Sequence, residues 1–335
     1  MEISDYKTLS CIKRHENNPV LTNEDVPYDC SLVFNAGVIK WKDGYAVAFR
    51  NDYGCNQQEW ESGKRFKGTC IGLAFSQDGI HWDVEPNPIF ELQNDEYLRA
   101  YDPRLTIIGD EVYMTFAVDT KHGICGGIAR TDDLHHFEML YLSVPDNRNM
   151  VLFPEKINGM YMRLERPMPV YSRGHRDRFD IWISESPDMI YWGNSRLLAA
   201  VEDFPFANDK IGLGAPPIKT EKGWLVFTHA VKKDETRGKY GWEAKWNKVY
   251  YAGVMLLDLE NPCEVLGICR NPLIVPEAPY ETDEGFRTHV VFPTAAILEG
   301  DLVRIYYGAS DTVTALATAN VNELIEACLA GGPRK

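Results

Sequence analysis

The chain repeats one phrase five times, and this repeat restricts the possible folds more than any other feature. Each copy has an apolar run rich in β-formers, a short polar turn and a second apolar run. In the first copy, the run 36–41 leads through Lys42-Asp43-Gly44 into the run 45–50. Glycine turns between β-rich runs are strong hairpin signals. The other four copies predict hairpins over 105–118, 152–166, 217–229 and 294–307.

A second phrase follows most of these hairpins. It is clearest at 74–82, recurs at 129–137 and 182–192, and has looser copies at 254–261 and 315–324. Two hairpins in each unit make a four-stranded antiparallel sheet, so five units predict an all-β fold, a five-bladed β-propeller. A β-sandwich would not need this doubling, and a TIM barrel or a Rossmann fold would need long helices. Only 321–329 has a helical pattern, so we expect one short C-terminal helix and a single catalytic domain over 1–335.

Composition and charge narrow the class of partner. The 335 residues are 44% hydrophobic, enough for a large core, and carry a net charge of −14. This charge argues against nucleic acid and anionic membrane surfaces as partners. No apolar run is long enough to span a membrane, and the charged start, 1–18, lacks the apolar centre of a signal peptide. None of the eight cysteines forms a CxxC pair, so we expect reduced thiols, no metal site and a cytoplasmic protein.

One acidic residue has an unusual setting. Asp102 stands between Tyr101 and Pro103, before the apolar run that starts at Leu105. A proline disfavours the helical conformation for the residue before it, so we expect Asp102 to be extended at the mouth of a strand. A carboxylic acid held in this way is a candidate general acid. The alternative is that Asp102 only caps a turn.

Polar residues recur where the predicted hairpins open. If the first hairpin of each blade is innermost, these positions ring one mouth of the central channel. Polar loop ends are normal in any protein, but basic residues are unexpected at so many strand ends in an acidic chain. Arginine and lysine converging beside an acid suit a dianion such as phosphate. The residues at these positions are Asn35, Arg50, Asp52, Asp102, Asp119, Arg148, Asn149, Arg166, Lys210, His229, Asp283, Arg287, His289 and Asp311.

Several longer phrases resemble glycoside hydrolase family 130, in order and over nearly the whole chain. They are Tyr101-Asp102-Pro103-Arg104, 152–159, 163–167, 212–217, 291–294 and 306–311. The resemblance implies an inverting β-mannoside phosphorylase on a five-bladed propeller. Such an enzyme cleaves a β-mannosidic bond with inorganic phosphate and releases α-mannose 1-phosphate and a shortened acceptor.

The resemblance also implies roles for individual residues. Asp102 matches the general acid, which is thought to act through the mannose 3-hydroxyl. Asp311 matches an acid near the mannosyl subsite. The phosphate-binding side is matched by Arg148, Asn149, Arg166, Lys210 and His229, with Tyr240 from a variable loop. We expect Asn35, Arg50, Asp52, Arg65 and Tyr101 to help bind sugar.

The basic residues on the phosphate-binding side indicate the type of reaction. We call them the basic set: Arg148, Arg166, Lys210 and His229. An inverting hydrolase needs an acid and a carboxylate that activates water, whereas a phosphorylase needs the acid and a cationic site for phosphate. Relatives resembling hydrolases lose the basic set, and here it is intact, which favours phosphorolysis of β-1,4-mannooligosaccharides. We expect no metal and no organic cofactor, with phosphate as co-substrate, and the family resemblance implies a homo-oligomer, a hexamer or a dimer.

Three questions stay open from the sequence. The acceptor could be mannose, N-acetylglucosamine or glucose. The protein could be an inverting β-mannosidase with Asp119 or Asp311 as the base, or a sugar-binding propeller without activity. The loop 232–248, with Trp242 and Trp246, could stack on acceptor sugars or could be a surface loop anchored by its aromatic residues.

Overall fold

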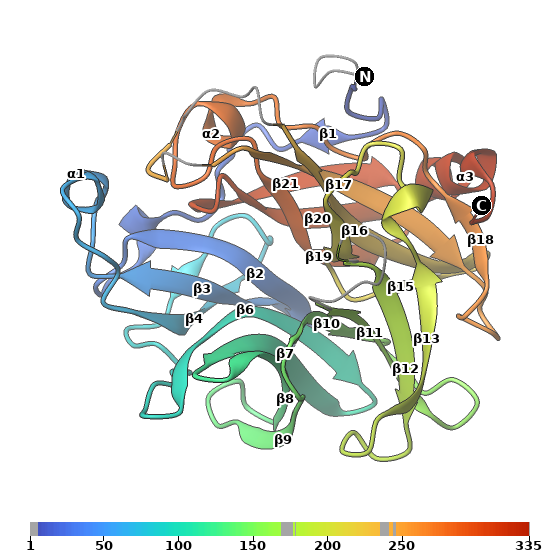
Figure 1. The fold of residues 1–335 in the computed structure, drawn as a ribbon, viewed down its shortest axis with the longest axis horizontal. Coiled ribbons are helices and arrows are strands. Elements are labelled where there is room, and N and C mark those ends of the chain that lie inside the picture. The colour runs from blue at the N-terminus through green and yellow to red at the C-terminus, as the bar shows by residue number, and fades with distance from the viewer. Residues whose placement is uncertain (1–5, 169–176, 178, 235–240, 244–245, 335) are drawn as a thin grey trace.

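Five antiparallel sheets surround a central channel in a computed structural model, which describes residues 6–168, 177, 179–234, 241–243 and 246–334 (Figure 1). Each sheet is one blade, and the five-bladed β-propeller prediction is confirmed. From the channel outward, the strands of the first blade are β2 (Leu32–Trp41), β3 (Gly44–Tyr53), β4 (Gly68–Ser76) and β5 (Asp83–Val84). Those of the second blade are β6 (Tyr97–Ile108), β7 (Glu111–Thr120), β8 (Gly123–Thr131) and β9 (Glu138–Leu142). Those of the third blade are β10 (Asn147–Leu152), β11 (Tyr161–Pro167), β12 (Ile181–Ser186) and β13 (Gly193–Ala199).

The fourth blade has a divided inner strand. Both β14 (Lys210–Leu213) and β15 (Ile218–Thr220) pair with β16 (Gly223–Lys233), which is followed by β17 (Lys248–Leu257) and β18 (Val265–Ile268). The sequence predicted only the second part of this inner strand. Pro216 and Pro217 lie between the two parts, and proline cannot donate a ladder hydrogen bond.

The fifth blade is closed by the other end of the chain. Its strands are β19 (Val291–Glu299), β20 (Leu302–Ala309), β21 (Val313–Asn320) and, as the outermost, β1 (Lys13–Arg14). The predicted second hairpin at 315–324 is therefore wrong, because β21 runs directly into helix α3 (Val321–Gly331). The predicted C-terminal helix is confirmed and extends two residues further. Leu324, Ile325 and Cys328 bury its apolar face.

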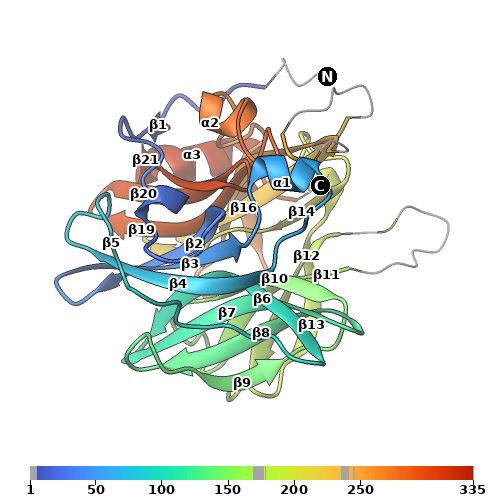
Figure 2. The same ribbon diagram turned by 90° about the vertical axis from the view of Figure 1, so that its left-hand side faces the viewer.

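An ion pair fastens this closure. Arg14 donates from Nε to Glu281 Oε1 at 2.8 Å and from Nη2 to Oε2 at 2.9 Å. Glu281 is fully buried in the short helix α2 (Pro279–Thr282) and also accepts from the Tyr307 hydroxyl. The first and last parts of the chain are thus joined side by side (Figure 2).

The second repeated phrase forms aspartate-stabilised turns. Asp78 Oδ1 accepts from the backbone amides of Ile80 and His81 at 2.8 and 2.9 Å. Asp133 and Asp188 accept from the amides two and three residues later in the same way. Asp favours such turns because its side chain replaces a backbone acceptor. The phrase is therefore explained by turn structure, and these aspartates lie outside the central channel.

Candidate active site

The inner strands open into a polar cavity at one mouth of the channel. Its volume is about 240 Å³, and it holds most of the residues that the sequence placed at strand ends. Trp246, Tyr250, Arg287 and Phe292 also line it. The remaining lining residues are Asn35, Arg50, Asp102, Arg148, Asn149, Arg166, Lys210, His229 and Asp311.

Three inner strands aim a polar side chain into this cavity by the same device. Asn35 on β2, Asp102 on β6 and Asn149 on β10 have φ values of 51°, 57° and 58°. Each coincides with a shift of the strand register. Asn and Asp tolerate the left-handed region better than other side chains, and a bulge redirects the side chain it carries. The expectation that Asp102 is extended is therefore wrong: the residue avoids the right-handed helical region but adopts the left-handed one.

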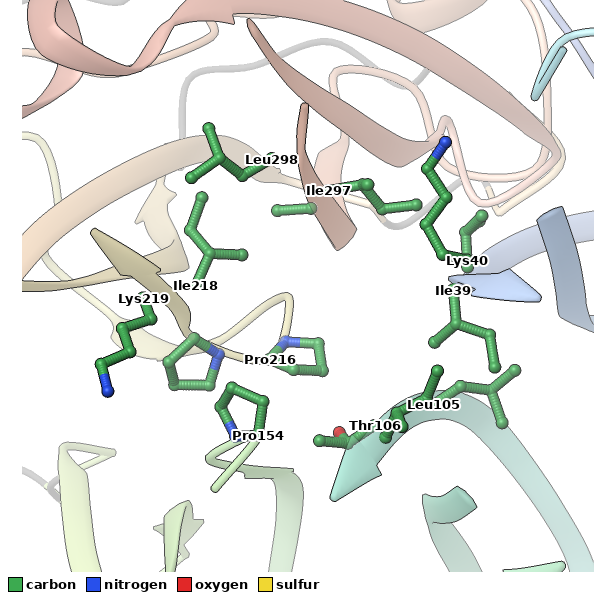
Figure 3. Close-up of a pocket in the computed structure, with 14 residues that line it drawn as sticks. Ile39, Lys40, Leu105, Thr106, Pro154, Pro216, Ile218, Lys219, Ile297 and Leu298 are labelled. Atoms are coloured by element: carbon green, nitrogen blue, oxygen red, sulfur yellow. The ribbon is translucent and has the colours of Figure 1, made fainter. Parts of the chain in front are cut away.

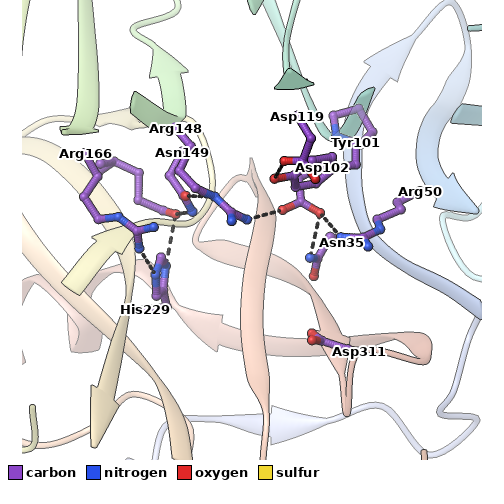
Figure 4. Close-up of polar contacts among 12 residues, drawn as sticks. Asn35, Arg50, Tyr101, Asp102, Asp119, Arg148, Asn149, Arg166, His229 and Asp311 are labelled. Carbon is purple, nitrogen blue, oxygen red and sulfur yellow. Dashed lines mark hydrogen bonds and ion pairs between the residues drawn. The ribbon is translucent and has the colours of Figure 1, made fainter. Parts of the chain in front are cut away.

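Asp102 is held on both carboxylate oxygens (Figure 4). Oδ1 accepts from Asn35 Nδ2 at 2.9 Å and from Arg50 Nη1 at 3.2 Å, and Oδ2 accepts from Arg148 Nη2 at 3.1 Å. Burial by itself raises the pKa of Asp102, but Arg50, Arg148 and Arg104 outweigh it and lower the pKa to about 2. Arg104 is buried below the cavity, where its Nε donates to the carbonyl of Gly214 at 2.6 Å. These three arginines therefore favour the ionised form of Asp102.

Two predicted sugar-binding residues support this arrangement from behind the cavity wall. Asp52 is buried and accepts from Arg50 Nε at 3.0 Å and Nη2 at 2.7 Å. Tyr101 is buried as well, with the guanidinium carbons of Arg50 and Arg148 at 4.8 and 5.2 Å from its ring centre. Its hydroxyl donates to Asp119. Neither side chain is among the residues that line the cavity, and both contact Arg50, which does line it.

One further predicted residue, Arg65, lies away from the cavity. Arg65 is exposed, with its guanidinium 4.4 Å from the Trp60 ring centre and hydrogen-bonded to backbone carbonyls near helix α1 (Gln57–Glu61). The structure does not bring Arg65 together with the other predicted site residues. Tyr240 lies outside the described residues.

One side of the cavity is formed by three cationic side chains and one imidazole from blades three and four. We call them the cationic set: Arg148, Arg166, Lys210 and His229. Arg166 is only 3% exposed, and its Nη1 lies 3.1 Å from His229 Nε2. Across the described parts of the chain, neither Arg166 nor Lys210 has an ion-pair partner, and Arg166 Nε is buried without a hydrogen bond. Burial and then Arg148 lower the pKa of Arg166 to about 10. Burial and then Arg166 hold the pKa values of Lys210 and His229 well below their usual ranges.

These shifts identify what the cationic set lacks. Buried cations are normally paired, and here they repel one another instead. A dianion placed among them would remove both the desolvation cost and the repulsion. The cavity is therefore suited to a compact, doubly charged anion next to Asp102.

The cavity wall also carries a second carboxylate and an aromatic stack. Asp311, which follows β20 with φ of 49°, accepts from Arg287 Nη1 at 3.2 Å. Burial raises the pKa of Asp311. Trp246 stacks on Tyr250 at 5.6 Å between ring centres, and Tyr250 stacks on His229 at 5.7 Å.

The sequence predicted some of the additional lining residues and not others; these residues are Trp246, Tyr250, Arg287 and Phe292. Arg287 was among the residues at strand ends, and Trp246 was a possible stacking residue in the loop 232–248. Tyr250 was missed because it lies on the third strand of its blade, where no inner-strand pattern applies. Phe292 belongs to a phrase used for the family resemblance and had no assigned role.

A second cavity lies at the other end of the same strands (Figure 3). Its volume is about 270 Å³, and its wall is mainly apolar, with Ile39, Leu105, Ile218 and Ile297 among its residues. Its two lysines, Lys40 and Lys219, are already paired with Glu299 and Glu155. This cavity has few of the polar groups that a sugar or phosphate requires.

In the part of the chain that the structure describes, no group of three or more His, Cys, Asp or Glu side chains is arranged to hold a metal ion. Among the helices described, none has the length and apolar character needed to cross a membrane.

The fold and the cavity together define a five-bladed propeller enzyme, and comparisons with known proteins give its family. The family described as β-1,4-mannooligosaccharide phosphorylase matches residues 8–329. The chain therefore belongs to glycoside hydrolase family 130.

Similar proteins differ in the linkage that their names specify. The chain is 34% identical over 332 residues to a β-1,4-mannooligosaccharide phosphorylase from Ruminococcus albus, covering 94% of this chain and 90% of that protein. It is 33% identical over 257 residues to a β-1,2-mannobiose phosphorylase from Listeria innocua, covering 76% and 67%. A solved structure of a β-1,2-mannobiose phosphorylase from Listeria innocua, in complex with β-1,2-mannobiose, has a TM-score of 0.80 at 27% identity and covers 95% of this chain and 99% of that one.

Proposed function

We propose that this protein is an inverting phosphorylase of β-1,4-mannosides, which transfers mannose to inorganic phosphate and releases α-mannose 1-phosphate. The observation that carries the proposal is that two cations of the cationic set are unpaired beside one buried acid, Asp102. Arg166 and Lys210 have no carboxylate partner in the described parts of the chain, and the ligand that best compensates them is phosphate.

In the proposed reaction, Asp102 is the general acid and the cationic set holds the nucleophile. Phosphate is already negatively charged, so no base is needed to activate it. Arg148, Arg166, Lys210 and His229 would offset its repulsion from Asp102 and Asp311 and would hold it in line with the scissile bond. Asn35, Arg50, Arg287 and Asp311, which also line the cavity, would contact the mannosyl unit.

Hydrolysis is less well supported. An inverting hydrolase requires a second carboxylate free to activate water. Asp119 is tied to Arg99 Nε at 2.7 Å and to the Tyr101 hydroxyl at 2.7 Å, outside the cavity wall. Asp311 lines the cavity, but its Oδ2 accepts from Arg287 Nη1 at 3.2 Å, so it is not free to activate water.

The test is an assay with β-1,4-mannobiose, with and without phosphate, in which mannose 1-phosphate and free mannose are measured. Phosphate-dependent mannose 1-phosphate supports the proposal. Free mannose at the same rate without phosphate means a hydrolase, and sugar binding without turnover means a binding protein. Reverse reactions with mannose, N-acetylglucosamine and glucose then identify the acceptor.

The Listeria innocua relatives favour a second candidate, phosphorolysis of a β-1,2-mannoside. The same assay with β-1,2-mannobiose separates the two linkages. We further propose that the reaction needs no metal or organic cofactor, so dialysis against EDTA should leave its rate unchanged. A cytoplasmic location is supported by the free state of the eight cysteines. Light scattering would test the predicted homo-oligomer.

A further inference from the structure

Arg148 contacts the proposed general acid, Asp102, and is also a member of the cationic set. Its Nη2 donates to Asp102 Oδ2 at 3.1 Å, and its Nε donates to Asn149 Oδ1 at 2.9 Å. Its charge also contributes to the lowered pKa values of Arg166, Lys210 and His229. Figure 4 shows its guanidinium between Asp102 on one side and Arg166 with His229 on the other.

The two arginines that hold Asp102 differ in what else they bind. Arg50 is fixed by Asp52, which accepts two hydrogen bonds from it. In the described parts of the chain, Arg148 has no carboxylate partner except Asp102. An anion arriving at the cationic set would therefore compete for Arg148 and would leave the Arg50 pair intact.

The groups around Asp102 favour its ionised form, which is the wrong protonation state for a general acid. Both oxygens accept hydrogen bonds, and three arginines favour the carboxylate. A general acid must carry its proton before the bond breaks. Some event in the reaction cycle must therefore reverse the balance of charge around Asp102.

We infer that phosphate binding is this event: by engaging Arg148, the dianion drives proton uptake by Asp102. The inference rests on the proposed phosphorolysis. A bound dianion offsets the positive charge of Arg148 and repels the nearby carboxylate, and both effects favour the protonated acid. The enzyme thus acquires its proton donor only when the nucleophile is in place.

The other groups around Asp102 do not provide this coupling. Asn35 and Arg50 face it from β2 and β3, and Arg104 lies below it on β6. Asp311 faces it from the loop after β20 as the other carboxylate in the cavity wall. None of these is shared with the cationic set as Arg148 is.

The proton balance is complete. One proton from solvent binds Asp102 when the phosphate dianion enters. During the reaction, a phosphate oxygen forms a bond to C1 of mannose, the C1–O glycosidic bond breaks, and the departing oxygen receives the proton of Asp102. Asp102 returns to the carboxylate, and the mannose 1-phosphate leaves as a monoanion that later loses its proton to solvent.

The experiment measures protons rather than activity. The full chain is titrated with inorganic phosphate in a calorimeter, in two buffers with different ionisation enthalpies. The difference between the two measured heats gives the number of protons taken up. Wild type is compared with Asp102→Asn, with Asp311→Asn and with the control Asp119→Asn, whose carboxylate lies outside the cavity wall. Phosphate itself ionises in every titration, and this contribution cancels when the proton numbers of two proteins are subtracted.

We expect wild type and Asp119→Asn to take up more protons than Asp102→Asn, by a difference approaching one proton. Infrared difference spectra of wild type should also show a protonated carboxyl band on phosphate addition, absent in Asp102→Asn. Equal proton numbers in wild type and Asp102→Asn would overturn the coupling while leaving phosphorolysis intact. If Asp311→Asn loses the proton uptake and Asp102→Asn keeps it, the proton belongs to Asp311, and the coupling to Asp102 is overturned. No phosphate binding by wild type would overturn the proposed function itself.

Discussion

Gly212 on β14 lies directly against His229, its register partner on β16. A Cβ at position 212 would lie 2.5 Å from His229 Cε1 and 3.1 Å from Arg166 Nη1. The absence of a side chain at Gly212 therefore allows the imidazole and the guanidinium to approach each other. This glycine controls the shape of the proposed phosphate site without contributing a polar group.

Gly212→Ala should weaken phosphate binding. The added methyl group would displace His229 and Arg166, and we expect the KM for phosphate to rise about tenfold, or about 1.4 kcal/mol. Gly193→Ala is the matched control, because nothing lies within 4 Å of a Cβ there. Steady-state kinetics against phosphate checks both variants. An unchanged KM in Gly212→Ala would show that the site tolerates the methyl group.

Asp102→Asn should abolish turnover in both directions. Removing a general acid typically costs about 10² to 10⁴ in rate. The amide is nearly isosteric, so sugar affinity should stay within about tenfold, or about 1.4 kcal/mol. Rates of phosphorolysis and synthesis, with calorimetric sugar binding, provide the check. Rates equal to those of wild type would remove Asp102 from the acid role.

Arg166→Gln should raise the KM for phosphate by about 10 to 100-fold, because a charge-assisted hydrogen bond to a buried anion is lost. Phosphate at ten times its dissociation constant should stabilise wild type by about 1.4 kcal/mol, and this stabilisation should largely disappear in the variant. Kinetics and thermal unfolding with and without phosphate measure these effects. Arg130→Gln is the control, because Arg130 pairs with Glu111 and Glu138 on the outer part of its blade. An unchanged phosphate dependence in Arg166→Gln would exclude Arg166 from the site.

His229 should make the ligand-free protein less stable as the pH falls. Burial, Arg166 and Lys210 hold the pKa of His229 well below 6.5, so the folded protein keeps the ring neutral. The unfolded chain binds a proton on this histidine below about pH 6.5. Where the unfolded state binds more protons than the folded state, lowering the pH lowers the free energy of unfolding. The contribution is therefore complete above about pH 6.5 and is lost progressively below it.

The measurement is urea unfolding between about pH 7.5 and pH 5 in phosphate-free buffer. His229→Gln should show a smaller loss of unfolding free energy over this interval than wild type. His122→Gln, which changes an exposed histidine, should keep the slope of wild type. Identical slopes for wild type and His229→Gln would contradict the prediction.

Arg14→Met should destabilise the closure of the fifth blade. It leaves Glu281 buried without its bidentate partner, and breaking a buried ion pair in this way costs about 3 to 5 kcal/mol. Lys13→Met changes the exposed neighbour on β1 and should cost less than about 0.5 kcal/mol. The free energy of unfolding in urea compares the two. Equal stability of both variants would show that the ion pair is not needed for closure.

Much of the architecture could be predicted because it depends on short-range chemistry. The five hairpin turns, the aspartate turns after them and the C-terminal helix are specified by residues within a few positions of one another. The errors arose where distant segments decide the outcome. β1 joins β21 because the propeller must close, and nothing near 315–324 shows that the outer strand comes from the other end of the chain.

For the site, the sequence by itself determined which residue types occur at the ends of the inner strands. It also established the family resemblance that suggested roles for Asp102 and the basic residues. Only the tertiary structure decided that Asp102 lies in a left-handed bulge, that Asp52 and Tyr101 lie behind the cavity wall, and that Arg148 contacts Asp102. The physical reason is that charge interactions depend on distances between blades, and those distances are set by packing around the channel and not by sequence separation.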